Sequence, residues 1–131
     1  MKSRFGFSLI ELLIVITLMS LILGLVAPLG FNMVQKAQAQ TEYLALQQKV
    51  FGFSNQAFVS GHIVELQFAQ ESMTVIRHRY QQESSRFSEK HVFDYIEVSQ
   101  PSRVLFNRNG IASVPSIDIT VRNQQKQLVF E

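Results

Sequence analysis

The chain has 131 residues, enough for one domain, and it lacks cysteine, which excludes disulfide bonds, thiolate metal sites and cysteine nucleophiles. Of the 12 Lys and Arg residues, two precede a long apolar block, and the other 10 balance 10 Asp and Glu. A body so close to neutral exerts little long-range attraction on nucleic acid or anionic lipid.

The apolar block is long enough to cross a bilayer. Residues 12–29 form a run of 18 positions, interrupted only by Thr17, Ser20, Gly24 and Pro28. As a helix, this run rises about 27 Å, close to the ~30 Å thickness of the hydrocarbon core. We therefore predict a transmembrane helix over residues 7–31 rather than a buried core helix. Because Lys2 and Arg4 precede it, the positive-inside rule places the N-terminus in the cytoplasm and residues 32–131 in the periplasm.

Two simpler interpretations share this outline. A cleaved secretory signal peptide has a shorter apolar core, and a cut after Ala27 would place Pro28 directly behind the cut. A plain single-pass anchor for a periplasmic binding domain accounts for the length of the block. It accounts neither for the Gly6–Phe7 junction nor for Glu11.

Glu11 is the residue that discriminates among these interpretations. A charged side chain in hydrocarbon costs on the order of 3 kcal/mol, so Glu11 needs either a partner or a shallow position near the head groups. A cut after Gly6 would leave the new α-amino group of Phe7 four residues from Glu11. An ammonium and a carboxylate one helical turn apart compensate each other, within one chain or between neighbouring chains.

These residues carry a resemblance to a known family. The segment "RFGFSLIELLIVITLMSLILGLVAP" resembles the class III signal of type IV prepilins and type II secretion pseudopilins. The resemblance implies a leader over residues 1–6, which a prepilin peptidase removes between Gly6 and Phe7 before it methylates the amine of Phe7. The mature chain would keep 125 of the 131 residues. Glu11 would then serve subunit assembly by pairing with the N-terminal amine of an adjacent subunit.

The same resemblance implies partners and a helix break. The expected partners are the prepilin peptidase, other pilins or pseudopilins, an inner-membrane assembly platform and membrane lipid. Gly24 and Pro28 lie where such helices carry breakers, and they unwind there in the filament. On physical grounds alone, Pro28 weakens the helix because it lacks a backbone donor and clashes with the preceding turn.

The helix is expected to continue to about residue 58 and to end near Gly61. Two adjacent stripes on it are apolar at helical spacing, and we expect this broad face to pack on a small sheet. The first stripe contains Phe31, Val34, Ala37, Thr41, Leu44, Gln48 and Phe51. The second contains Leu46, Val50, Phe53 and Ala57.

Residues 62–131 change to a period of two. "HIVELQF" and "MTVIRHRY" predict a hairpin across the turn "AQES", and residues 81–90 read as a polar loop. Further short strands are expected in "FDYIEVS", "RVLF", "SIDITVR" and "QLVF", separated by Pro101, the turn at 107–110 and Pro115. A helix followed by antiparallel strands predicts an α+β fold, with a pilin-like globular domain over residues 32–131.

The segment "VLFNRNGIAS…SIDITV" resembles the C-terminal half of the GspH/FimT-like minor pilins. This resemblance favours a minor pseudopilin of a type II secretion system. A minor pilin of a type IV pilus, acting in fibre initiation, adhesion or DNA uptake, is the alternative. The chain lacks both the C-terminal cysteine pair of many type IV pilins and the calcium-binding loop of major pseudopilins, which argues against a major subunit.

No catalytic, cofactor or metal motif is present in the sequence. There is no G-x-S-x-G, phosphate loop or H-E-x-x-H, and the spacing of His62, His78 and His91 fits no metal site, so we expect no enzyme, cofactor or metal. "RHRY" at 77–80, together with further basic residues, forms a candidate nucleic-acid patch. Interleaved acidic residues favour a mixed solvated surface instead. The additional basic residues are Arg86, Lys90, Arg103 and Arg108.

Overall fold

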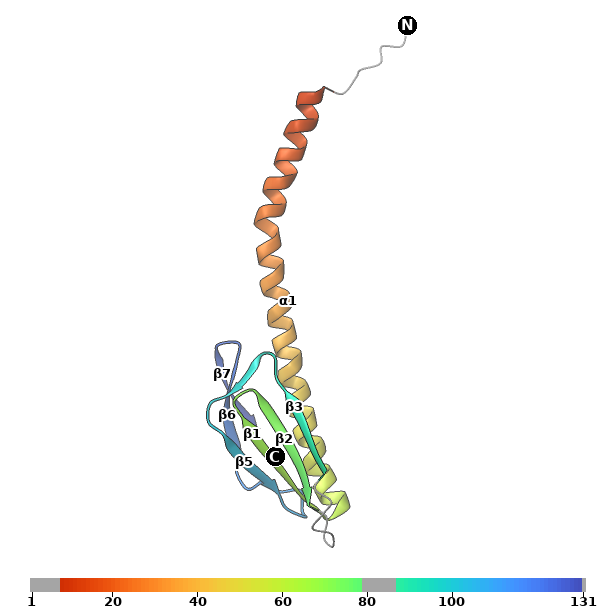
Figure 1. Ribbon diagram of the computed structural model, residues 1–131, viewed down its shortest axis with the longest axis vertical. Coiled ribbons are helices and arrows are strands. Elements are labelled where there is room, and N and C mark those ends of the chain that lie inside the picture. Colours follow the sequence, from red (N-terminus) through yellow and green to blue (C-terminus); the bar gives the residue numbers. More distant parts are fainter. Residues whose placement is uncertain (1–7, 79–86, 131) are drawn as a thin grey trace. The chain divides into compact units, whose positions relative to one another are not determined.

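The computed structural model describes residues 8–78 and 87–130. The chain divides into two compact units, residues 1–36 and residues 37–131. The long helix α1, Leu9–Ser60, contributes to both units, and all the strands belong to the second (Figure 1). This confirms the predicted α+β fold of one long N-terminal helix with antiparallel sheets.

The larger sheet of the second unit has four antiparallel strands in the order β3-β2-β1-β5. The predicted hairpin is confirmed, because Leu66 pairs with Val75 and Ala69 pairs with Ser72. The four strands of the larger sheet are β1 (Ile63–Ala69), β2 (Ser72–His78), β3 (Phe87–Val92) and β5 (Ser102–Phe106).

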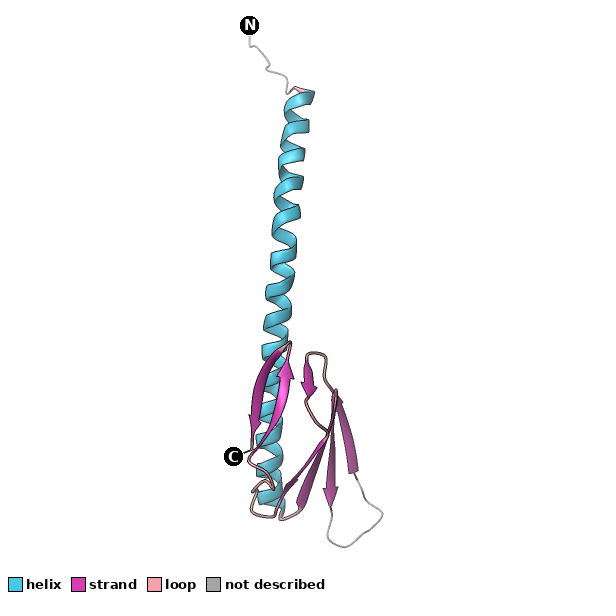
Figure 2. Cartoon of the chain, turned by 90° about the vertical axis from the view of Figure 1, so that its left-hand side faces the viewer, coloured by secondary structure: helices cyan, strands magenta, loops and turns pink. Residues whose placement is uncertain are grey.

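A second sheet has three antiparallel strands in the order β4-β6-β7, and Figure 2 shows its long hairpin beside the helix. Its strands are β4 (Ile96–Val98), β6 (Ser116–Val121) and β7 (Gln124–Val129). β6 and β7 are joined by a two-residue turn, in which Arg122 and Asn123 have φ of 44° and 66°. Positive φ at both turn residues matches the twist of the flanking strands. The sequence indicated these strands but not their division into two sheets.

The core lies where both sheets and the second half of α1 meet. Alternate residues of β1 are buried as predicted, with Val64, Leu66 and Phe68 on the inner face. Phe130 joins the sheets, because its ring lies 6.2 Å from that of Phe68 and 6.1 Å from that of Phe106. The remaining buried apolar side chains include Leu46, Val50, Ala57, Met73, Val75, Ile96, Val98, Val104, Ile119, Val121 and Leu128.

Two predictions from the sequence are wrong, one about the packing of α1 and one about the start of a strand. Of the two helix stripes, only the second packs on the sheets, whereas Leu44 and Phe51 of the first are 48% and 62% exposed. The first stripe contains polar residues, and its Thr41 hydroxyl is satisfied by the helix itself through the C=O of Ala37 at 2.9 Å.

The predicted loop over 81–90 is also incorrect at its end, since residues 87–90 belong to β3. β3 is an edge strand with exposed polar side chains, so no alternation marks it.

Two glycines of this unit, Gly61 and Gly110, have positive φ. α1 ends at Ser60, and Gly61 follows with φ of 65°, which confirms the predicted helix stop. Gly110 has φ of 75° in the predicted turn at 107–110. A Cβ on Gly110 would lie 2.9 Å from the C=O of Ser54 on α1, so only glycine lets this turn approach the helix.

Glu42 ties α1 to the turn between β3 and β4. Its two carboxylate oxygens accept hydrogen bonds from the N–H groups of Asp94 and Tyr95, both at 2.8 Å. The Tyr95 hydroxyl donates to Gln38 Oε1 one turn earlier on the helix, also at 2.8 Å. Hydrogen bonds to a charged acceptor are stronger than neutral ones, so this contact fixes the turn on the helix.

We expect Glu42→Ala to destabilise the second unit by about 2 kcal/mol, because two N–H groups lose a charged acceptor at a half-buried site. In a unit of this size, the midpoint of thermal unfolding should fall by roughly 8–16 °C. Thermal unfolding of the full-length protein in detergent measures this. Glu71→Ala removes an exposed carboxylate and is the matched control. Equal midpoints for the two variants would show that the Glu42 contact does not stabilise the fold.

Candidate functional site

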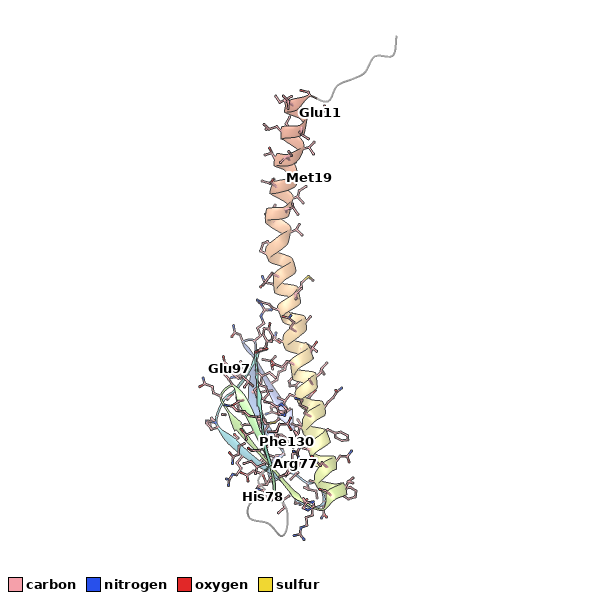
Figure 3. All side chains as sticks on the ribbon, turned by 45° about the vertical axis from the view of Figure 1, so that its right-hand side comes forward. Glu11, Met19, Arg77, His78, Glu97 and Phe130 are labelled. Atoms are coloured by element: carbon pink, nitrogen blue, oxygen red, sulfur yellow. The ribbon has the colours of Figure 1, made fainter. Side chains whose placement is uncertain are left out.

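The candidate site at the start of the chain comprises the predicted cleavage junction and Glu11. Gly6 and Phe7 lie outside the described residues. Glu11 lies in the first turn of α1, exposed, and Figure 3 shows it at the beginning of the helix. Among the described residues, none forms an ion pair with Glu11. The structure therefore leaves the carboxylate of Glu11 exposed in the first turn of α1.

The helix start supplies part of the compensation for this charge. Leu12 N–H donates to the C=O of Ser8 at 3.2 Å, so the helix begins directly after Ser8. Glu11 is then the third helical residue, where the unpaired N–H groups and the helix dipole favour a carboxylate. Ser8 and Glu11 also have the spacing of a capping box, S-x-x-E. This pattern of four residues is a local signal for the start of the helix.

Between residues 12 and 29, the surface of α1 is apolar except for two hydroxyl side chains. The helix is long and apolar enough to cross a membrane, and no residue in its most apolar stretch of 18 residues is buried. The two hydroxyls within it are satisfied internally: Thr17 donates to the C=O of Leu13 at 2.6 Å and Ser20 to that of Ile16 at 2.8 Å. No donor of these side chains is therefore left to face hydrocarbon, as a lipid-exposed helix requires.

Gly24 and Pro28 affect the same helical turn. α1 is helical through both residues, so the break expected in a filament stays a prediction. Pro28 has no N–H for the C=O four residues earlier, and that residue is Gly24. Since glycine also has a low helix propensity, the turn from Gly24 to Pro28 is the weakest of the apolar segment. It is where unwinding would cost least.

The comparisons with known proteins agree with this description of the N-terminal segment. The family model described as "Prokaryotic N-terminal methylation motif" matches residues 1–27. The comparisons with curated proteins and with solved structures gave no match.

The matched residues include the Gly6–Phe7 junction, Glu11 and the first part of α1. The match supports the type IV prepilin-like family for the N-terminal segment, which is about a fifth of the chain. The motif implies processing by a prepilin peptidase and assembly with other pilins.

The candidate basic patch of the sequence analysis is divided by carboxylates. Arg77 lies 3.7 Å from Glu89 and also donates to Gln56 Oε1 at 3.3 Å. Arg103 Nε donates to Glu65 Oε1 at 2.7 Å. Residues 79–86, which include several members of the patch, lie outside the described part of the chain. Arg77 and Arg103 therefore form ion pairs with carboxylates of the larger sheet itself.

The three histidines do not gather. His78 Nε2 lies 2.8 Å from Glu65 Oε2, whereas His91 lies between Lys49 Nζ at 3.1 Å and Glu89 Oε1 at 3.2 Å. Within residues 8–78 and 87–130, no three acidic or histidine side chains converge as a metal site requires. His78 and His91 serve as partners of carboxylates on the larger sheet, whereas the main-chain N–H of His62 donates a hydrogen bond to Ser60 Oγ at 3.3 Å.

Glu65 is buried on the outer face of the larger sheet, with its side chain only 6% exposed. Burial acts to raise its pKa, but hydrogen bonds from Gln67 and His78 and the charge of Arg103 outweigh burial and lower the pKa below its ordinary value of 4.5. The carboxylate therefore contributes stability in the folded state above that ordinary value. The contribution is lost as the pH falls through the lower pKa of the folded state.

We expect Glu65→Gln to lower the free energy of unfolding at pH 7 by about 1–3 kcal/mol, because two exposed partners lose a buried charged acceptor. The difference from the unchanged protein should shrink as the pH falls from the ordinary pKa of 4.5 through the lower pKa of the folded state, where Glu65 itself becomes protonated. Denaturant unfolding of the full-length protein in detergent, followed across this pH range, measures it. Glu97→Gln, at an exposed carboxylate of β4, is the control. A difference that is independent of pH would contradict the assigned role of the carboxylate.

Proposed function

We propose that the protein is a non-enzymatic structural subunit of a pilin-type filament. The observation that carries this proposal is the methylation motif at residues 1–27, joined to an apolar helix whose surface is unburied. An apolar helical surface of this length needs lipid before assembly and neighbouring helices after it. Lipid would surround the helix of the subunit in the membrane, and neighbouring helices would surround it in the filament.

In this proposal, the prepilin peptidase cuts between Gly6 and Phe7 at the cytoplasmic face of the inner membrane and methylates the new amine. Residues 7–31 then form the single transmembrane and assembly helix, and residues 32–131 form the periplasmic domain. The assembly platform of the inner membrane moves the subunit from lipid into the filament. The exposed Glu11 in the first turn supports this course, because its carboxylate is available to a neighbouring N-terminal ammonium.

The finer proposal is a minor pseudopilin of a type II secretion system. It is supported by the resemblance of the C-terminal strands to GspH/FimT-like subunits and by the lack of cysteine. A minor pilin of a type IV pilus uses the same N-terminal chemistry and is the second candidate. Neighbouring genes decide between them: genes for a secretion system support the first, and genes for a pilus the second.

Mass spectrometry of the N-terminus tests the proposed processing. The protein purified from membranes of cells with active prepilin peptidase should begin at N-methylated Phe7. The same protein from cells that lack the peptidase should begin at Met1. A start at Gln40 in both strains, directly after the A-x-A pattern of Ala37 and Ala39, would instead indicate an ordinary signal peptide and would remove the proposal.

A further inference from the structure

A cleft of about 460 Å³ opens in the second unit where β5 and β6 begin. It is polar along its rim, and it is formed by residues of two strands and of the segments that precede them. Its lining consists of Ser99, Gln100, Ser102, Arg103, Val114, Ser116, Ile117 and Asp118. No residue of α1 contributes to it, so the cleft is separate from the assembly segment.

One side of the cleft is an open strand edge. β5 pairs with β1 on one side only, and at its end the N–H of Leu105 donates to Ser113 Oγ at 3.0 Å, while its C=O accepts from Ser113 N–H at 2.8 Å. Leu105 thus turns its main-chain groups away from β1. Because these groups alternate along an antiparallel strand, the N–H and C=O of Arg103 point the same way. Among the described residues, none hydrogen-bonds to either group.

The other side of the cleft is also an open edge. β4 pairs with β6 only from Ile119 to Val121, and the last contact on this side is a 3.3 Å hydrogen bond from Ser99 N–H to the C=O of Asp118. By the same alternation, the N–H of Asp118 and both main-chain groups of Ser116 face the cleft. Within the described part of the chain these three groups have no hydrogen-bond partner.

We propose that this cleft binds an extended peptide segment of another protein, which adds a strand between β5 and β6. Each open edge is three residues long, from Ser102 to Val104 and from Ser116 to Asp118, so each side offers about 10 Å of unpaired backbone. Donors and acceptors from both edges match the two-sided pattern of a single strand. An unpaired backbone edge is the feature that recruits such strands.

The lining also indicates the side chains of the segment. The half-buried Val114 and the buried Ile117 lie under one face of the cleft, where alternate apolar side chains would pack. The exposed Asp118 lies at the rim, and the side chain of Arg103 is held by Glu65, so polar side chains fit the other face. The segment therefore alternates apolar and polar residues. This proposal goes beyond the filament role and does not depend on it, because no residue before Ser99 takes part.

Peptide selection on the full-length protein in detergent micelles tests the proposal. A displayed library of random nine-residue peptides should yield binders with alternating apolar and polar residues. A fluorescent synthetic copy of a selected peptide is then titrated with the protein, alongside a copy whose main-chain amides are N-methylated. Methylation should weaken binding by about tenfold or more, because it removes backbone donors without changing any side chain.

A matched pair of variants locates the binding. Arg103→Pro removes the open N–H at 103 and no hydrogen bond to β1, and it should weaken binding by about tenfold. Arg103→Ala loses the same contact to Glu65 but keeps the N–H, and it should bind as the unchanged protein does. Equal affinities for the two variants, equal affinities for the methylated and unmethylated peptides, or a library without enrichment would each overturn the proposal. Circular dichroism verifies the fold of Arg103→Pro, and the methylated peptide decides the matter on the unchanged protein if that variant does not fold.

Discussion

Gly6→Val should abolish formation of the mature protein while leaving the full-length precursor in the membrane. A peptidase must approach the backbone on both sides of the bond that it cuts, and a branched side chain next to that bond obstructs the approach. The apolar block remains intact in this variant, so insertion should not change. The ratio of precursor to mature chain, measured by mass spectrometry of membrane fractions, gives the result.

Gly30→Val provides the control for this experiment. It makes the same change at a glycine of α1, where an added Cβ meets nothing within 4 Å. Its processing should match that of the unchanged chain, and Gly6→Ala should lie between the two. Normal amounts of mature Gly6→Val would show that the cut does not fall between Gly6 and Phe7.

Glu11→Leu should leave cleavage and membrane insertion intact but strongly reduce incorporation into filaments. If the carboxylate meets the ammonium of Phe7 in a neighbour, its removal leaves an unpaired charge in apolar surroundings. The penalty for breaking a buried pair in this way is about 3–5 kcal/mol. It corresponds to a loss of roughly two to nearly four orders of magnitude in the equilibrium for adding the subunit. Co-purification with partner pilins, compared with processing of the same variant, measures this loss.

Ser20→Leu adds the same side chain to an exposed position of the same helix without removing a charge, so it should still assemble. Glu11→Asp keeps the charge and should retain part of the incorporation. If Glu11→Leu assembled as well as Ser20→Leu, the carboxylate would need no partner. The interpretation as a plain membrane anchor would then stand.

The N-terminal segment could be interpreted from sequence because its chemistry is local. The basic residues, the Gly6–Phe7 junction and Glu11 lie within a dozen positions, and a peptidase or a bilayer encounters them in that order. The family match over residues 1–27 agrees with this interpretation. The position of Glu11 in the first helical turn follows from the same local pattern, because Ser8 directly precedes the helix.

The alternation of buried and exposed residues along a single strand could also be predicted from the sequence. Val64, Leu66 and Phe68 predicted one buried face of β1, and all three are buried. β3 escaped detection because an edge strand is held by backbone pairing on one side. Its exposed side chains need not alternate, and Ser88, Glu89 and Lys90 gave no signal.

Only the tertiary structure decided which apolar stripe of α1 is buried and which carboxylates are used. Both stripes have helical spacing, and the choice between them depends on where two sheets meet the helix. Glu42 contacts main-chain groups 52 and 53 residues later, and Glu65 is paired with His78 and Arg103 from other strands. The open edges beside Arg103 and Ser116 likewise exist only because β4 is short and β5 has one neighbour. Such contacts arise from the register of distant segments, which no local pattern of residues specifies.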